Sequence, residues 1–139
     1  MRTVIIGANH AGIAVANTLL DNYTDQQVVM IDRNSNLSYL GCGTALWVGR
    51  QIDSYENLFY TSAEAFEAKG AEVHMETSVD RVDYEGKRVF CTTLSGESFE
   101  VAYDKLVLAC GSLPISPKIP GADLDNISFL KLFQQGQDV

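Results

Sequence analysis

The stretch from Thr3 to Asp32, TVIIGANHAGIAVANTLLDNYTDQQVVMID, decides the fold. It begins with the short β-branched run TVII, which is typical of a strand buried on both faces. A glycine-bounded turn follows, and then GIAVANTLLDNY, whose apolar residues recur near the helical period. The run QVVMI predicts a second strand, which ends at Asp32. A strand, a tight turn, a helix and a strand in about thirty residues form a βαβ unit, so we expect the two strands to be parallel.

The rest of the chain predicts short helices and further strands. We expect a helix over about residues 43–49 and another that Ser62 caps and Gly70 ends. Residues 71–103 alternate in strand fashion around turns at YEGK and LSGES, which predicts a short antiparallel β-meander. The run KLVLAC predicts a final buried strand. The predicted class is therefore α/β, a Rossmann-like parallel sheet with helices on its faces plus a small antiparallel meander.

The last part of the chain predicts a connection and the start of another element. GSLPISPKIPG holds all three prolines, which favours an extended connection. ISFLKLFQQGQDV then begins an element without a closing turn, so we expect the chain to be a piece of a longer protein.

Composition narrows the classes of function. The 139 residues include 10 basic and 18 acidic side chains, a net charge of −8, which argues against nucleic acid or an anionic membrane as a partner. No apolar run approaches the roughly 18–20 residues of a membrane span, and MRTVIIGANHAG does not resemble a signal peptide. Cys42, Cys91 and Cys110 have irregular spacing, which predicts neither a disulfide framework nor a metal site and favours the reducing cytoplasm.

The turn GANHAG predicts a phosphate-binding loop. It places Gly7 and Gly12 at the first and last positions of G-x-G-x-x-G, with Asn9 in place of the middle glycine. Free N–H groups at the helix start and the helix dipole would hold the phosphates, although the Asn9 side chain weakens the match. Asp32 lies 20 residues after Gly12, where a carboxylate accepts hydrogen bonds from a ribose hydroxyl. The pattern favours a dinucleotide site over the alternative, an ordinary turn followed by a solvated aspartate.

Three motifs carry a resemblance to a known family. GANHAG with MIDRN, SYLGCGTALWVG, and LVLACGSLPISPKIPG together resemble the FAD domain of the pyridine nucleotide-disulfide oxidoreductases. Within that superfamily the chain is similar to the single-cysteine branch, which contains water-forming NADH oxidases, NADH peroxidases and coenzyme A-disulfide reductases. The resemblance extends over all 139 residues. It implies that residues 1–121 are the first segment of an FAD-binding domain and that 122–139 begin the connection toward an NADH-binding domain.

The resemblance also implies which residues bind FAD. Residues 7–12 match the turn that binds the pyrophosphate, and Asp32 matches the acidic residue that binds the ribose. Residues 109–112 match a turn beside the flavin. Arg33 would lie beside the adenosine, and the backbone of Val79 would face the adenine. The implied cofactor site comprises Gly7, Ala8, Asn9, His10, Ala11, Gly12, Asp32, Arg33, Cys42, Val79, Ala109, Cys110, Gly111 and Ser112.

The remaining cysteines and the second histidine have structural interpretations. We expect Cys110 and Cys91 to be small buried residues, and His74 to be structural.

Cys42 matches the redox cysteine of the family, beside the isoalloxazine ring. Two-cysteine reductases place a second cysteine five positions later, but this chain has Trp47 there. An unpaired thiolate still exchanges two electrons as a sulfenic acid or a mixed disulfide. The family places His10 near this sulfur, where an imidazole manages protons near neutral pH. The flanking glycines would let sulfur and backbone approach a flat ring. A packed, unreactive cysteine is the alternative.

The resemblance implies the FAD-binding part of an NADH oxidase. The complete enzyme, expected to be a homodimer, would take hydride from NADH to FAD and pass electrons through Cys42 to dioxygen, giving water. The closest alternatives are an NADH peroxidase, with peroxide as acceptor, and a coenzyme A-disulfide reductase, in which Cys42 would form a mixed disulfide. An alternative of another class is a non-catalytic nucleotide-binding module.

Overall fold

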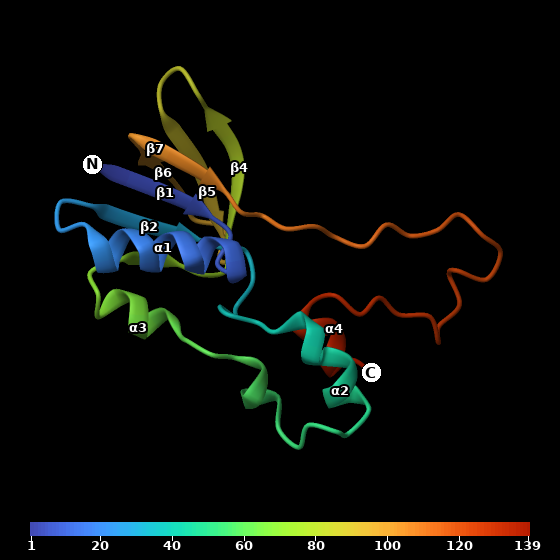
Figure 1. Cartoon of the computed structure of the whole chain (residues 1–139). Helices are drawn as coiled ribbons and strands as arrows, with labels where there is room; N and C mark the ends of the chain where they lie inside the picture. The colour runs from blue at the N-terminus through green and yellow to red at the C-terminus, as the bar shows by residue number, and fades with distance from the viewer. The chain divides into compact units, whose positions relative to one another are not determined.

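The computed structural model describes residues 1–139 (Figure 1). These residues form two compact units. The first unit comprises residues 1–38 and 61–110, and the second comprises residues 39–60 and 111–139. None of the helices combines the length and the apolar character that a membrane span requires.

A four-stranded parallel sheet organises the first unit. Its strands lie in the order β3 (Glu72–His74), β2 (Gln27–Ile31), β1 (Arg2–Ile6) and β7 (Lys105–Leu108). Helix α1 (His10–Asn22) connects β1 to β2, so the predicted βαβ unit is confirmed. Ile6 pairs with Ile31, and the two strands therefore end side by side at Gly7 and Asp32.

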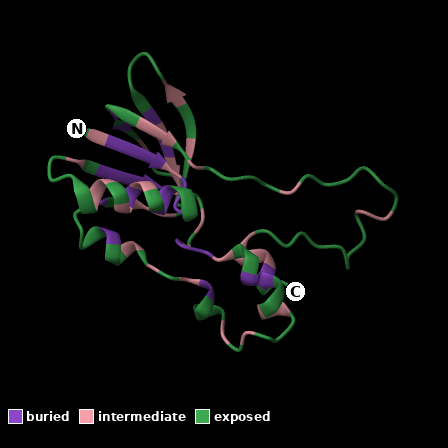
Figure 2. Cartoon of the chain, in the orientation of Figure 1, coloured by how far each residue is buried: buried purple, intermediate pink, exposed green.

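Side chains of β1 and β2 alternate between two cores, one on each face of the sheet. This two-sided burial explains why both strands are continuous apolar runs, and Figure 2 shows them buried along most of their length. One core joins the strands to α1 and to Phe66 of α3 (Ala63–Glu67); it contains Ile5, Ala8, Ile13, Ala16, Val28, Met30, Leu37, Phe66 and Ala71. The other joins them to the antiparallel sheet and contains Val4, Val29, Ile31, Val89, Cys91, Val101 and Tyr103.

The antiparallel sheet is the predicted meander, except that the segment before residue 77 does not belong to it. It consists of β4 (Thr77–Asp83), β5 (Arg88–Thr93) and β6 (Ser98–Ala102), with an irregular register between Val79 and Arg81. The prediction that the segment from residue 71 belongs to the meander was wrong, because β3 pairs parallel with β2. At Glu76 the backbone takes a φ of 52°, and the chain leaves β3 there to begin β4 in the other sheet.

Strand β7 lies at an edge of the parallel sheet, so the prediction that it is buried was wrong. It pairs only with β1, its residues Leu106 and Val107 are half-buried, and Leu108 is 60% exposed. An apolar run predicts a strand, but whether neighbours cover its faces depends on tertiary structure.

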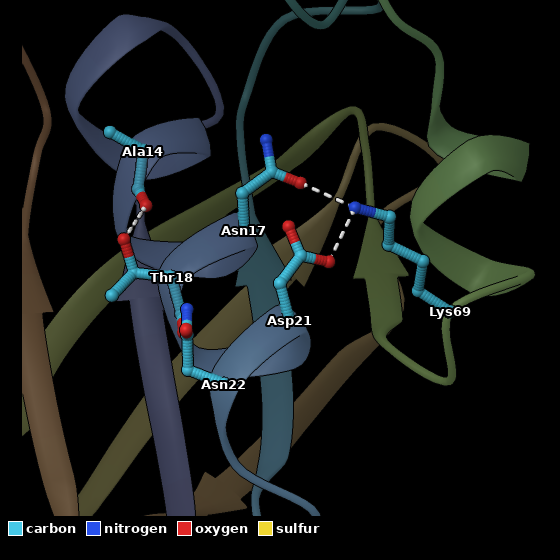
Figure 3. Close-up of polar contacts among 6 residues, drawn as sticks. All are labelled: Ala14, Asn17, Thr18, Asp21, Asn22 and Lys69. Atoms are coloured by element: carbon cyan, nitrogen blue, oxygen red, sulfur yellow. Dashed lines mark hydrogen bonds and ion pairs between the residues drawn. The ribbon is translucent and has the colours of Figure 1, made fainter.

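Helix α3 begins at the predicted cap. The Ser62 hydroxyl accepts a hydrogen bond from the Ala65 N–H at 3.4 Å, and Gly70, with a φ of +90°, follows the helix. Beyond α3, the Lys69 ammonium donates to Asn17 Oδ1 at 2.9 Å and to Asp21 Oδ1 at 2.8 Å (Figure 3). These two acceptors lie one turn apart on α1, so Lys69 links α1 to the loop after α3. The ion pair is exposed and contributes about 0.5 kcal/mol.

The second unit is built around an aromatic cluster. Its elements are the 3₁₀ helix η1 (Gly41–Gly43), α2 (Thr44–Val48), the 3₁₀ helix η2 (Tyr55–Leu58) and α4 (Phe133–Gln137). The helix predicted over about 43–49 is confirmed, and residues 111–118 contain no helix or strand, as their prolines predict. The ring of Phe133 has its centroid 5.1–5.8 Å from four others, which completes a cluster of Tyr39, Trp47, Tyr55, Phe59 and Phe133.

Cys91 is expected to make the first unit sensitive to alkaline pH. Burial in the core beside the meander, with a smaller contribution from the charge of Asp80, raises the pKa of Cys91 to about 11. Between about pH 9 and 11 an unfolded chain would lose this proton while the folded chain keeps it, so the free energy of unfolding falls as the pH rises. The expected loss is about 2 kcal/mol, measured by urea unfolding at several pH values.

The matched control is Cys91→Ala, which has no thiol to titrate at this position. It should lose less stability than the unchanged protein over the same pH range, and equal losses would contradict the assignment. Iodoacetamide at pH 8 should also modify Cys91 far more slowly than the exposed Cys42 and Cys110, as mass spectrometry of each cysteine peptide would report.

Candidate functional site

The turn after β1 brings backbone segments together more closely than side chains would allow. Gly7 has a φ of +109°, and its N–H donates to the Ile31 carbonyl at 2.8 Å. A Cβ added to Gly7 would lie 2.6 Å from the carbonyl carbon of Ala109, and one added to Gly12 would lie 3.0 Å from that of Gly7. Both glycines are therefore required by the close packing of the turn, the helix and the end of β7.

Asn9 is the N-cap of α1. Its side-chain oxygen accepts a hydrogen bond from the His10 N–H at 3.0 Å and lies 2.8 Å from His10 Nδ1, while its carbonyl accepts from Ile13. An N-cap is a role that asparagine fills well, so the departure from glycine has a structural reason here. Asn9, His10 and Ala11 are exposed at a helix start, where first-turn N–H groups lack partners within the helix.

The Asp32 carboxylate joins the ends of β1 and β2. Its Oδ2 accepts from the Ala8 N–H at 2.7 Å, and its Oδ1 accepts from the backbone N–H and the side-chain amide of Asn34, both at 2.8 Å. A carboxylate has roughly four acceptor positions, so three contacts leave one for another donor. Asp32 thus fixes the glycine turn and remains half-buried at its margin.

Ser38 also holds the glycine turn, through a contact with Ala8, and it was not predicted from the sequence as a site residue. It is fully buried with a φ of 67°; its N–H donates to the Ala8 carbonyl at 3.2 Å. Its hydroxyl donates to the Thr61 carbonyl at 2.7 Å and accepts from the Thr61 N–H at 3.1 Å. Nothing in the local sequence distinguishes this serine. Asn34 was also missed, although an amide two residues after an aspartate is a recognisable turn signal.

The other residues predicted for the first unit lie in different surroundings. Ala109 donates its N–H to the Ile6 carbonyl at 2.8 Å and lies against Gly7, so the structure brings it to the glycine turn. Arg33 is exposed, and Val79 packs half-buried against the core beside the meander. The prediction that Cys110 is buried was wrong: it is exposed, because it follows the uncovered edge strand β7.

Cys42, Gly111 and Ser112 belong to the second unit. Cys42 is an exposed free thiol in η1, directly before α2, and is therefore not enclosed in packed hydrocarbon. Gly111 and Ser112 are exposed at the start of the proline-rich connection. An accessible thiol can react with a soluble oxidant or a disulfide.

The first unit has the features of a site for a phosphorylated nucleotide. An exposed helix start lies at the carboxyl ends of parallel strands, next to a carboxylate with one acceptor position left.

Comparisons with known proteins agree with this geometry. The family model described as pyridine nucleotide-disulphide oxidoreductase matches residues 1–139. The NADH oxidase of Lactococcus lactis subsp. cremoris is 59% identical over 139 residues, covering 100% of this chain and 31% of that protein. An NADH oxidase of Streptococcus pneumoniae is 45% identical, covering 99% of this chain and 32% of that protein. This chain therefore spans about a third of the length of these relatives.

Solved structures show the same fold. The water-forming NADH oxidase from Lactobacillus brevis bound to NADH has a TM-score of 0.93 at 35% identity, covering 99% of this chain and 31% of that chain. Reduced CoADR-RHD from Bacillus anthracis has a TM-score of 0.94 at 23% identity, covering 99% and 25%, and supports the fold alone. The predicted fold class is confirmed, and the chain belongs to the pyridine nucleotide-disulphide oxidoreductase family.

Proposed function

We propose that this chain is the FAD-binding segment of a water-forming NADH oxidase in which Cys42 is the redox-active residue. The observation that carries the proposal is the exposed start of α1 beside the Asp32 carboxylate, at the ends of two parallel strands. The choice of oxidase rather than peroxidase or disulfide reductase is supported by relatives named NADH oxidase at 59% and 45% identity.

The residues of the glycine turn fit a dinucleotide cofactor. Gly7 and Gly12 keep the turn tight, and first-turn amides at an exposed helix start are suited to a pyrophosphate. The remaining acceptor position of Asp32 suits a ribose hydroxyl. A net charge of −8 does not oppose this binding, since local N–H groups hold the phosphates.

We assign the cofactor contacts as follows. Residues 7–12 hold the pyrophosphate, and Asp32 binds the ribose. Arg33 and the backbone of Val79 contact the adenosine, and residues 109–112 lie beside the flavin. Residues 1–121 then form the first segment of the FAD-binding domain, and 122–139 begin the connection to an NADH-binding domain.

Cys42 and His10 carry out the chemistry that the protein itself supplies. Bound FAD provides the hydride and electron transfer that links NADH to the acceptor. The Cys42 thiolate attacks one oxygen of the peroxide formed from dioxygen, the O–O bond breaks, and hydroxide leaves while the sulfur becomes a sulfenic acid. His10 provides the proton that turns this hydroxide into water. Two electrons from NADH and two protons then return the sulfenic acid to the thiol and release a second water.

The test is to purify the full-length protein and examine its flavin and its acceptors. We expect a yellow protein with flavin absorbance that alkylation of Cys42 perturbs, and NADH oxidation with dioxygen as the preferred acceptor over added peroxide or coenzyme A disulfide. A colourless protein that no flavin restores would favour the non-catalytic module. Preference for peroxide or for the disulfide would reassign the enzyme to the corresponding branch.

A further inference from the structure

The turn that carries Cys42 is packed at one end only: Gly43 is buried against Leu58, whereas Gly41 and Cys42 are exposed. Cys42 lies between Gly41 and Gly43, so its neighbours in η1 have no side chains to anchor it. Backbone bonds close the start of the turn: the Gly41 N–H donates to the Tyr39 carbonyl at 3.1 Å, and the Gly43 N–H donates to the Leu40 carbonyl at 2.8 Å. The Cys42 side chain is exposed, so contacts from outside the turn must fix its direction.

A chain of two hydroxyl groups ends at this turn. The Thr44 hydroxyl donates to the Gly41 carbonyl at 2.9 Å and also contacts the Tyr39 hydroxyl. A hydroxyl has one proton, and a carbonyl only accepts, so the Thr44 proton points to Gly41 and the Tyr39 hydroxyl donates to Thr44. The order is therefore Tyr39 to Thr44 to the Gly41 carbonyl.

The Gly41 carbonyl belongs to the same planar peptide as the Cys42 N–H. Holding this oxygen fixes the plane of the peptide and with it the position of the Cys42 Cα, from which the side chain leaves the backbone. The Thr44 N–H donates to the same oxygen, so Thr44 holds it through both its backbone and its side chain.

Both hydroxyl side chains are buried and packed against their neighbours. Thr44 is 1% exposed and Tyr39 is 4% exposed. Gly136 of α4 lies against Thr44, since a Cβ added there would be 3.0 Å from the Thr44 methyl carbon. The Tyr39 ring lies 5.6 Å from that of Phe59 and 5.7 Å from that of Phe133, measured between centroids. Packing therefore leaves the hydroxyl of Thr44 directed at the turn.

We propose that Tyr39 and Thr44 are positioning residues for the Cys42 sulfur, acting through the Gly41–Cys42 peptide. The proposal rests on the proposed function, in which this sulfur must face a flavin. Both residues are buried and their hydroxyls contact only protein groups, so they act on the sulfur through the backbone. They help to set the direction of the thiol. Removing either hydroxyl should therefore change the position of the sulfur while leaving the binding of the cofactor unchanged.

The test compares hydroxyl variants in the full-length protein. Thr44→Val removes the hydroxyl and keeps the shape, Thr44→Ser restores the hydroxyl, and Tyr39→Phe removes the outer donor. Tyr55→Ala is the matched control, because it removes packing from the same aromatic cluster without touching the hydroxyl chain. The readouts are the change in flavin absorbance when Cys42 is alkylated, and kcat against KM for NADH.

Thr44→Val should reduce the absorbance change to less than about half and lower kcat about tenfold, with KM for NADH and flavin content within about twofold. Tyr39→Phe should have a smaller effect in the same direction, while Thr44→Ser and Tyr55→Ala should stay close to the unchanged protein. An unchanged signal in Thr44→Val, or an equal loss in Tyr55→Ala, would overturn the positioning role. If alkylation of the unchanged protein leaves its flavin spectrum unaltered, the proposed function fails, and the positioning role fails with it.

Discussion

The full-length protein with Cys42→Ser is expected to consume about one NADH per dioxygen and release hydrogen peroxide, whereas the unchanged protein consumes about two and releases water. Serine keeps the size and exposure of the side chain but cannot cycle between a thiolate and a sulfenic acid at neutral pH. Transfer of one electron pair reduces dioxygen to hydrogen peroxide. Without the thiolate, the second electron pair cannot reduce the peroxide to water. The substitution should therefore change the product more than it changes flavin binding.

The measurement combines NADH absorbance with an oxygen electrode. If peroxide is the product, catalase added at the end should return about half of the consumed oxygen in Cys42→Ser and almost none in the unchanged protein. Cys91→Ala is the control, since this thiol lies buried in the core beside the meander and should have no part in the product. Water as the product of Cys42→Ser would show that position 42 is not the redox centre.

Local sequence signals predicted the part of the first unit that holds the glycine turn. Apolar runs in β1 and β2, with the helical period between them, determine parallel strands that end together. The position of Asp32 then follows, because the residue after β2 must lie beside the turn after β1. Ser62 was predicted as a cap because its role depends only on the next turn of chain.

Features that depend on distant partners were not predictable in the same way. A three-residue strand such as β3 has no pattern that says which sheet it joins. The exposure of β7, and of Cys110 after it, depends on what covers a sheet edge. Ser38 supports the turn through its backbone and through Thr61, contacts that no local pattern encodes. The hydroxyl chain to Gly41 likewise requires Tyr39 and Thr44 to be packed before their proximity matters.

Gly7→Ala is expected to abolish flavin retention and to destabilise the first unit by about 3 kcal/mol. Two terms contribute. A φ of +109° disfavours any residue with a Cβ, and the added carbon would lie 2.6 Å from the Ala109 carbonyl carbon. Because that carbonyl is part of the backbone that follows β7, relief requires the glycine turn and this segment to move apart. The movement would displace the amides that we assign to the pyrophosphate.

Gly96→Ala separates the cost of the backbone conformation from the cost of the close contact. Gly96 has a φ of +88°, but an added Cβ there would meet nothing within 4 Å, and the residue lies in the turn between β5 and β6. This variant should lose only about 1 kcal/mol, from the backbone conformation alone, and should keep its flavin. Urea unfolding and the flavin-to-protein absorbance ratio measure both effects. Equal losses of stability in the two variants would mean that the close contact at Gly7 is relieved without movement of the turn. Retention of flavin by Gly7→Ala would mean that the pyrophosphate binds elsewhere.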